Sequence, residues 1–212
     1  MDYLLELNIN RIFDFLGTFA FALSGIRLAS AKQFDWFGAY VIGFVTAIGG
    51  GTVRDLLLDV TPFWMIDPAY LVLTGIALLA SLLFKHQLFS FGKTLFLFDT
   101  IGLGLFTMVG LEKSLDAGLP FWTCIIMGAI TGALGGVIRD TLINEIPLLF
   151  RKDIYALASI AGGVVYFVCI DLGVVDTWAF PVAAVSVIAI RALAVKFHIH
   201  LPNIQNLDTK AK

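Results

Sequence analysis

Two adjacent arginine–aspartate pairs are the residues whose types and positions offer the clearest chemistry. Arg54-Asp55 and Arg139-Asp140 each lie within a long apolar stretch. A charge inside a bilayer costs about 2.5–3.5 kcal/mol on insertion scales, so such residues face the interior of a helix bundle and have partners there. Neighbours on a helix point about 100° apart, so neither arginine is expected to be neutralised by its own neighbour alone. The sequence therefore predicts crossed pairing, in which each arginine bonds the aspartate of the other pair.

Two further aspartates in apolar stretches, Asp14 and Asp99, are rival partners for the arginines. Paired intramembrane charges of this kind have two explanations, because they either line a permeation path or clamp the helices that carry them. The sequence leaves both explanations open.

A stretch of small residues precedes each charged pair. It contains Thr46, Gly49, Gly50 and Gly51 before the first pair, and Thr131, Gly135 and Gly136 before the second. Each glycine costs a helix about 1 kcal/mol relative to alanine, so successive glycines favour a kink or a break. Carbonyl oxygens freed at a break can replace the hydration shell of a cation. Close helix packing explains the same stretch, but the run of three glycines favours a kinked, pore-lining helix.

The composition places these residues in a protein that is dissolved in lipid. The 212-residue chain is 59% hydrophobic and 14% charged, with a mean hydropathy of +0.92. Soluble domains are about 45–50% apolar and about 25% charged. The composition therefore excludes an ordinary cytosolic domain, a disordered chain and a nucleic-acid binder with a basic face.

The residue types typical of enzymes are not arranged for catalysis. The histidines His86, His198 and His200 fall in predicted loops or the tail, and no nucleotide-binding or nucleophile–base motif occurs. Cys124 and Cys169 lie in apolar stretches without metal-ligand spacing. We therefore expect no enzymatic activity, no metal site and no cofactor.

Seven stretches are long and apolar enough to be read as membrane-spanning helices. Because about 20 apolar residues cross a bilayer, the predicted spans are about 11–29, 37–58, 68–84, 93–112, 120–143, 153–170 and 177–197. Pro68 and Pro120 stand at span starts, where a missing N–H is harmless. The predicted architecture is an all-helical bundle, followed by a polar, cytoplasmic tail over residues 198–212.

Lysine and arginine are distributed unevenly between the two predicted sides of the membrane. One side holds Arg27, Lys32, Lys85, Lys93, Arg151, Lys152, Arg191, Lys196, Lys210 and Lys212, and the other holds only Arg11 and Lys113. Cytoplasmic loops carry the excess of basic residues. We therefore expect an integral protein of the bacterial inner membrane, with its N-terminus outside and its C-terminus cytoplasmic.

The sequence repeats itself at an offset of 85 residues. The matched residues include Phe13 and Phe98, Asp14 and Asp99, Gly25 and Gly110, Thr46 and Thr131, Gly50 and Gly135, Arg54 and Arg139, Asp55 and Asp140, Pro62 and Pro147, and Tyr70 and Tyr155. Each copy, about 11–84 and about 93–170, contains three spans, so the second copy starts on the opposite side of the membrane. Inverted repeats of this kind are typical of transport proteins. The helix at about 177–197 falls outside the repeat.

The doubled motif resembles the prokaryotic branch of the trimeric intracellular cation channel (TRIC) family. The segments that carry the resemblance are Gly50-Gly51-Thr52-Val53-Arg54-Asp55, Gly135-Gly136-Val137-Ile138-Arg139-Asp140 and its continuation to Phe150, and Tyr155-Ala156-Leu157-Ala158-Ser159. The resemblance implies a 3+3 inverted repeat plus one helix, a homotrimer, and a pore for K⁺ and Na⁺ in each protomer. It implies that the second and fifth helices bend at their glycines and line that pore. The phosphoinositide-binding motif of the animal members is not found in this sequence.

Two other functions compete with a cation channel. A secondary transporter for a small zwitterion such as glycine would use arginine to bind the carboxylate, and bacterial relatives often carry that label. A membrane scaffold without transport is the third alternative. Step-like K⁺ currents would indicate the channel, and saturable uptake without steps would indicate the carrier.

Overall fold

The computed structural model describes residues 2–84, 94–151 and 154–201, with side chains from residue 11 onward. Its elements are helices, as predicted. They are α1 (Asp2–Ala31), α2 (Trp36–Leu57), α3 (Phe63–Ile66), α4 (Ala69–Leu83), α6 (Thr94–Asp116), α7 (Phe121–Leu142), the 3₁₀ helix η1 (Leu148–Phe150), α8 (Ala156–Asp171) and α9 (Asp176–Lys196). The predicted residues 202–212 of the tail lie outside the described residues.

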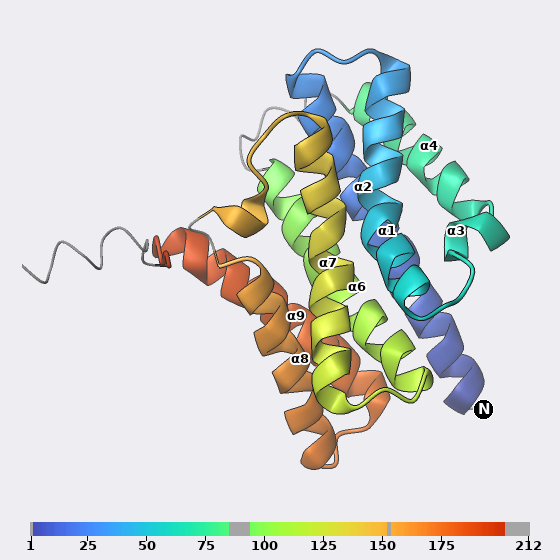
Figure 1. The fold of residues 1–212 in the computed structure, drawn as a ribbon, viewed down its shortest axis with the longest axis vertical. Coiled ribbons are helices and arrows are strands. Elements are labelled where there is room, and N and C mark those ends of the chain that lie inside the picture. Colours follow the sequence, from blue (N-terminus) through green and yellow to red (C-terminus); the bar gives the residue numbers. More distant parts are fainter. Residues whose placement is uncertain (1, 85–93, 152–153, 202–212) are drawn as a thin grey trace, which may run out of the picture.

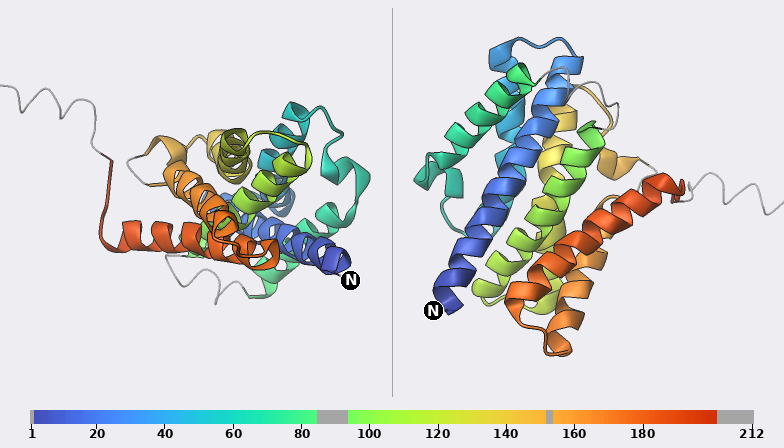
Figure 2. Two further views of the ribbon diagram at one scale, coloured as in Figure 1. Left: turned by 90° about the horizontal axis from the view of Figure 1, so that it is seen from below. Right: turned by 180° about the vertical axis from the view of Figure 1, so that it is seen from behind.

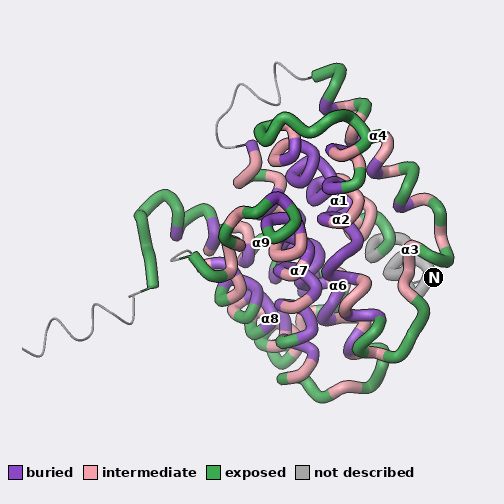
Figure 3. The backbone as a smooth tube through the Cα atoms, turned by 45° about the horizontal axis from the view of Figure 1, so that its top comes forward, coloured by how far each residue is buried: buried purple, intermediate pink, exposed green. Residues whose placement is uncertain are grey.

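Four long helices form the centre of the bundle (Figure 1). Helices α1, α2, α6 and α7 pack against one another in the pairs α1–α2, α1–α6, α2–α7 and α6–α7. Helix α4 packs against α1 and α2, whereas α8 and α9 pack against α7 and α6 respectively (Figure 2). Buried residues are concentrated along the central helices, and the connecting turns are exposed (Figure 3). The charged pairs of α2 and α7 therefore lie in the interior of the bundle.

Within the described residues, five helices are long and apolar enough to cross a membrane, namely Arg11–Ala31, Trp36–Leu57, Thr94–Asp116, Phe121–Leu142 and Asp176–Lys196. The other two predicted spans correspond to the shorter apolar helices Ala69–Leu83 and Ala156–Asp171. These have 15 and 16 residues, which is fewer than the roughly 20 needed to cross the hydrocarbon core without bilayer thinning. The all-helical class is confirmed, and the count of seven spans stays a prediction.

Local residue chemistry sets where the paired helices begin and end. Pro120 directly precedes α7, and Asp35 caps α2 by accepting the backbone amide of Gly38 at 2.7 Å. Just beyond α2 and α7, Asp59 and Asn144 adopt positive φ values of 55° and 58°, a left-handed conformation that these two residue types tolerate. Helices α2 and α7 thus end in the same way, 85 residues apart.

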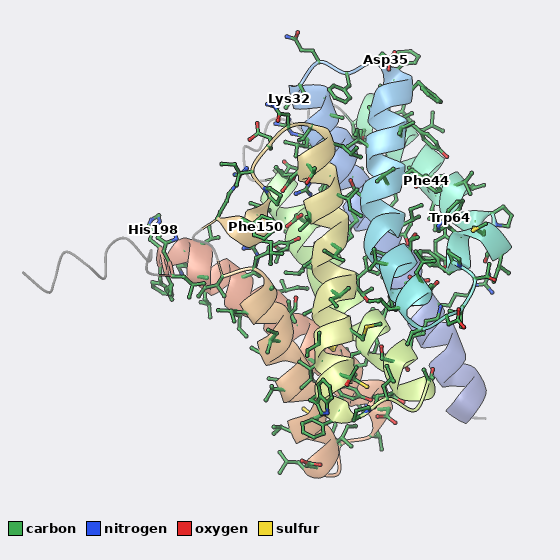
Figure 4. The ribbon with its side chains drawn as sticks, viewed as in Figure 1. Lys32, Asp35, Phe44, Trp64, Phe150 and His198 are labelled. Atoms are coloured by element: carbon green, nitrogen blue, oxygen red, sulfur yellow. The ribbon has the colours of Figure 1, made fainter. Side chains whose placement is uncertain are left out.

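The sequence did not predict the short helix α3, which turns the chain back onto α2. Its Trp64 donates from Nε1 to Thr52 Oγ1 at 3.0 Å. The Trp64 ring also meets Phe44 edge-on, with 5.7 Å between ring centroids (Figure 4). These contacts fix the segment that follows Asp55.

An exposed ion-pair cluster joins the ends of α1 and α7. Lys32 Nζ lies 2.6 Å from Glu145 Oε1, and Arg151 Nη2 lies 3.5 Å from Glu145 Oε2. Lys32 lies at the α1 end of this cluster (Figure 4). Its hydrogen bond and positive charge hold the pKa of Glu145 below the ordinary value.

Because the pKa of Glu145 is lowered in the folded state, its contribution to stability is present above the ordinary pKa of about 4.3 and is lost as the pH falls through the folded-state value. We expect the Glu145→Gln protein to show a shallower fall of melting temperature between about pH 5 and pH 3 than the unmodified protein. Asp171→Asn, a change at an exposed residue far along the chain, is the control. Equal acid sensitivity of all three proteins would contradict this role of Glu145.

Candidate functional site

The two arginine–aspartate pairs lie at opposite ends of the crossing between α2 and α7. Lys113, near the end of α6, reaches Asp55 on α2, whereas Lys32, beyond the end of α1, reaches Glu145 beyond α7. Helices α2 and α7 are therefore antiparallel, as Figure 1 shows, and each carries its charged pair in its last turn. This geometry makes the predicted crossed pairing wrong, because the two pairs are separated by the length of the crossing.

The first pair is closed within itself and is joined by a lysine. Arg54 Nε donates to Asp55 Oδ1 at 2.8 Å, and Lys113 Nζ donates to the same oxygen at 2.8 Å. Asp55 Oδ2 accepts the backbone amide of Phe63 at 2.9 Å. The flexible arginine side chain folds back to its neighbour although the two Cβ atoms diverge. The prediction that an arginine needs a partner besides its neighbour is therefore wrong for Arg54, whereas Arg139 does bond a second carboxylate, Asp99. Arg54 additionally lies over the Phe63 ring, 5.5 Å from its centroid.

The second pair repeats this arrangement and adds a third helix. Arg139 Nε donates to Asp140 Oδ1 at 2.8 Å, and Asp140 Oδ2 accepts the amide of Leu148 at 3.1 Å. Leu148 occupies the position that matches Phe63. Arg139 Nη1 donates to Asp99 Oδ1 on α6 at 2.7 Å and to Ser24 Oγ on α1 at 3.0 Å. The rival partner Asp99 is thus the correct one for Arg139.

The other rival partner, Asp14, has a different environment. Its Oδ2 accepts a hydrogen bond from the Tyr70 hydroxyl, just as Asp99 accepts one from the matching Tyr155 at 3.4 Å. The cation of the first pair, Arg54, is hydrogen-bonded to Asp55 and not to Asp14. Asp14 instead lines a cavity, whereas Asp99 is fully buried.

The glycines place α2 and α7 in direct backbone contact. A Cβ atom added at Gly50 would overlap the carbonyl oxygen of Thr131, and one added at Gly135 would overlap that of Thr46. Both threonine side chains are fully buried and donate within their own helices, to Ile42 O at 2.6 Å and Met127 O at 2.7 Å. The crossing is therefore sealed in this structure.

Both helices continue without interruption through their glycines. The predicted break, with carbonyls freed for a cation, is not found in either helix. A Cβ at the remaining glycines would meet the side chain of Ile138 at Gly49, the Phe63 ring at Gly51 and the Tyr155 hydroxyl at Gly136. Close packing accounts for these contacts, because a larger residue at any of the three positions would overlap the neighbouring side chain. A pore-lining role for the glycines and threonines stays a prediction.

A cavity of about 630 Å³ opens beside the first charged pair. Its lining comes from α1, α3, α4, α6 and the segments between them, and comprises Arg11, Asp14, Val60, Thr61, Phe63, Ile66, Asp67, Tyr70, Val109, Glu112, Lys113 and Asp116. We call it the vestibule. Four of its lining residues are acidic and two are basic, and one of the bases, Arg11, is paired with Asp67 at 2.8 Å. Acidic clefts of this kind raise the local concentration of cations.

The described part of the chain contains no group of three or more histidine, cysteine, aspartate or glutamate side chains that could hold a metal ion. The carboxylates of both charged sites are instead engaged by arginine, lysine, tyrosine or backbone amides.

Comparison with known proteins connects this architecture to a family. The chain matches the family described as "Glycine transporter" over residues 11–86 and again over residues 96–171. It is 39% identical to a UPF0126 membrane protein of Vibrio cholerae, over 93% of this chain and 84% of that protein. It is 38% identical to the UPF0126 inner membrane protein YadS of Escherichia coli (strain K12), over 89% of this chain and 93% of that protein.

Solved structures decide between the related families. The TRIC trimeric intracellular cation channel orthologue from Rhodobacter sphaeroides superposes with a TM-score of 0.84 at 31% identity, covering 90% of this chain and 99% of that one. A TRIC channel studied for its conductance gives a TM-score of 0.81 at 38% identity, covering 91% and 96%. This chain is a prokaryotic member of the TRIC family. The resemblance seen in the doubled motif is thereby confirmed.

One charged residue of this TRIC protein was missed as part of the site. Arg191 was counted among the cytoplasmic basic residues, but it is only 2% exposed and its Nη2 lies 3.8 Å from Asp99 Oδ2. Its position inside the predicted span 177–197 was the available signal, since an arginine within an apolar span faces the bundle interior. It belongs to α9, which begins after the second family match has ended.

Proposed function

We propose that this protein is a channel for monovalent cations, K⁺ and also Na⁺, and that it works as a homotrimer with one pore in each protomer. The observation that carries the proposal is the likeness to TRIC cation channels over at least 90% of the chain. In this proposal α2 and α7 line the pore, and their glycine crossing is its closed constriction.

The arrangement of charge supports cations as the permeant species. An unpaired arginine in the path would repel them, but Arg54 and Arg139 both bond aspartate at 2.8 Å. The vestibule adds an acidic entrance whose lining includes Asp14. Conduction then requires α2 and α7 to move apart at Gly50 and Gly135, where their backbones now touch.

An inverted 3+3 repeat followed by α9 accounts for the two charged sites at opposite ends. The two family matches are offset by the same 85 residues as the matched side chains. With this repeat, the short helices α4 and α8 complete each three-helix unit and bring the total to seven spans. The basic residues of the sequence favour a cytoplasmic C-terminus in the bacterial inner membrane.

Transport of glycine is the second candidate, and the description of the matched family favours it. A carrier of this kind needs a cation free to bind the substrate carboxylate. The guanidinium groups of Arg54 and Arg139 are already bonded by aspartates, and this argues for the channel. Purified protein in liposomes decides the matter. Unitary K⁺ currents support the channel, whereas saturable glycine uptake without such currents would contradict it.

Asp14→Asn tests whether the vestibule serves the path. We expect K⁺ flux to fall on the order of tenfold, because a charged cleft raises the local counter-ion concentration by about that factor or more. The effect should shrink at high ionic strength, where charges are screened. Asp171→Asn removes an exposed carboxylate that does not line the vestibule, so it should leave the flux unchanged. Equal fluxes from the two variants would argue against this entrance.

A further inference from the structure

Asp14 and Asp99, which occupy matching positions in the repeat, differ in their accessibility. Asp14 faces the vestibule, an open cavity of about 630 Å³. Asp99 is 0% exposed and is enclosed by α1, α6, α7, α8 and α9 through Ser24, Arg139, Tyr155 and Arg191. The repeat by itself would make these ends alike, so something outside it must close the second one.

Helix α9 supplies that difference through Arg191. Its guanidinium lies 4.7 Å from the Tyr155 ring centroid and 5.2 Å from that of Phe96. Its Nη1 donates to the carbonyl of Ile154 at 3.2 Å. A cationic group is thus held between aromatic faces and directed at Asp99. Asp14 also has cations nearby, because Arg54 and Lys113 act on it electrostatically and Arg11 lines the same cavity. These cations are bonded to other carboxylates, however: Arg54 and Lys113 to Asp55, and Arg11 to Asp67.

Among the described residues, the four buried charges at this end balance. Arg139 and Arg191 face Asp99 and Asp140, and none of the four is more than 2% exposed. The ion pair between Arg191 and Asp99 is long, however, because Arg191 Nη2 lies 3.8 Å from Asp99 Oδ2. Asp99 Oδ2, Arg139 Nη2 and Arg191 Nε all lack a hydrogen-bond partner. Incompletely bonded buried charges cost free energy, so Arg191 is held at this end less tightly than Arg139, which bonds Asp99 at 2.7 Å.

We propose that Arg191 is a tethered cation that occupies the place beside Asp99 which a permeant cation would otherwise take, and so keeps this end of the path closed. The inference rests on the proposed cation-channel function. Conduction then requires α9 to carry Arg191 away from Asp99. Asp99 Oδ1 stays bonded to Arg139 at 2.7 Å, and Oδ2 is left without a facing cation, so that it can attract K⁺. Arg191 acts here as a positioning residue, through Asp99.

The direct test is K⁺ flux through Arg191→Met protein in liposomes. We expect flux to rise at least about fivefold, because one unit of positive charge about 4 Å from the carboxylate is removed from a site of intermediate dielectric. Arg191→Lys keeps the charge and should restore the low flux. Asp99→Asn combined with Arg191→Met removes both charges, so it should abolish the gain. Lys196→Met, an exposed change on the same helix, is the control.

A titratable variant makes the test independent of differences in folding between proteins. In Arg191→His protein the flux should fall as the pH drops from about 8 to about 5.5, since the imidazole becomes charged in that range. The unmodified protein should not show this fall. Folded Arg191→Met protein with unchanged or lower flux, or Arg191→His protein whose flux ignores pH, would overturn the inference. If neither the unmodified nor the Arg191→Met protein passes K⁺ while a solved TRIC channel does so in the same vesicles, the proposed function itself fails.

Discussion

Arg139→Gln protein is expected to lose about 3–5 kcal/mol of unfolding free energy, the usual consequence of removing one partner from a buried ion pair. The loss is large because Arg139 makes the short bonds to two buried carboxylates, those of Asp99 and Asp140, whereas Arg191 approaches Asp99 only to 3.8 Å. In thermal unfolding of the purified protein in detergent, the melting temperature should fall by roughly 10 °C.

The matching change in the other half of the chain provides the control. In Arg54→Gln protein, Asp55 still receives Lys113 at 2.8 Å and the amide of Phe63 at 2.9 Å. We therefore expect a smaller loss of unfolding free energy, in the range of a single charged hydrogen bond, about 1.5–3 kcal/mol. Equal losses in the two variants would show that the extra carboxylate, Asp99, does not depend on Arg139.

Gly50→Ala protein is expected to lose about 3 kcal/mol or more of unfolding free energy, which is the upper end of the usual cost of overpacking a protein interior. The new methyl group would overlap the carbonyl oxygen of Thr131, and a backbone atom cannot turn aside as a side chain can. The measurement is again thermal unfolding in detergent. Gly135→Ala should behave alike, because its Cβ would meet the carbonyl of Thr46 in the same way.

Gly75→Ala is the matched control for this prediction. Gly75 lies in α4, and no atom lies within 4 Å of a Cβ added there. The same substitution should therefore stabilise the protein by up to about 1 kcal/mol, the difference in helix propensity between the two residues. Stability changes of opposite sign for Gly50→Ala and Gly75→Ala would establish that the contact between α2 and α7 determines the effect at Gly50. A neutral Gly50→Ala protein would mean that the α2–α7 crossing is looser than described.

Sequence and structure agree where a property depends on residues close together in the chain. Apolar runs of about 20 residues predicted helices at the observed places, and the bounds of α2 and α7 differ from the predicted spans by one residue at each end. Composition predicted a membrane protein. Helix α3 was missed because four residues are too few to show a periodic pattern, and because its position depends on the contact of Trp64 with α2.

The charged pairs show where sequence reasoning fails. The offset of 85 residues correctly singled out Arg54 and Arg139, but symmetry between copies does not say which side chains meet. Antiparallel packing carries the two pairs to opposite ends, so each arginine closes on its own neighbour and Arg139 reaches Asp99 as well. The glycines were correctly identified as special, and the structure uses them for close approach of two unbroken helices.

The sequence by itself determined that this is an all-helical membrane protein, which residues inside it are charged, and which family it resembles. Those properties follow from the cost of placing polar groups in lipid, and that cost acts on every segment separately. Only the tertiary structure decided the partners of the charges, the sealing of the α2–α7 crossing and the placement of Arg191 beside Asp99. Those depend on how helices distant in the chain pack together, and no local pattern encodes that geometry.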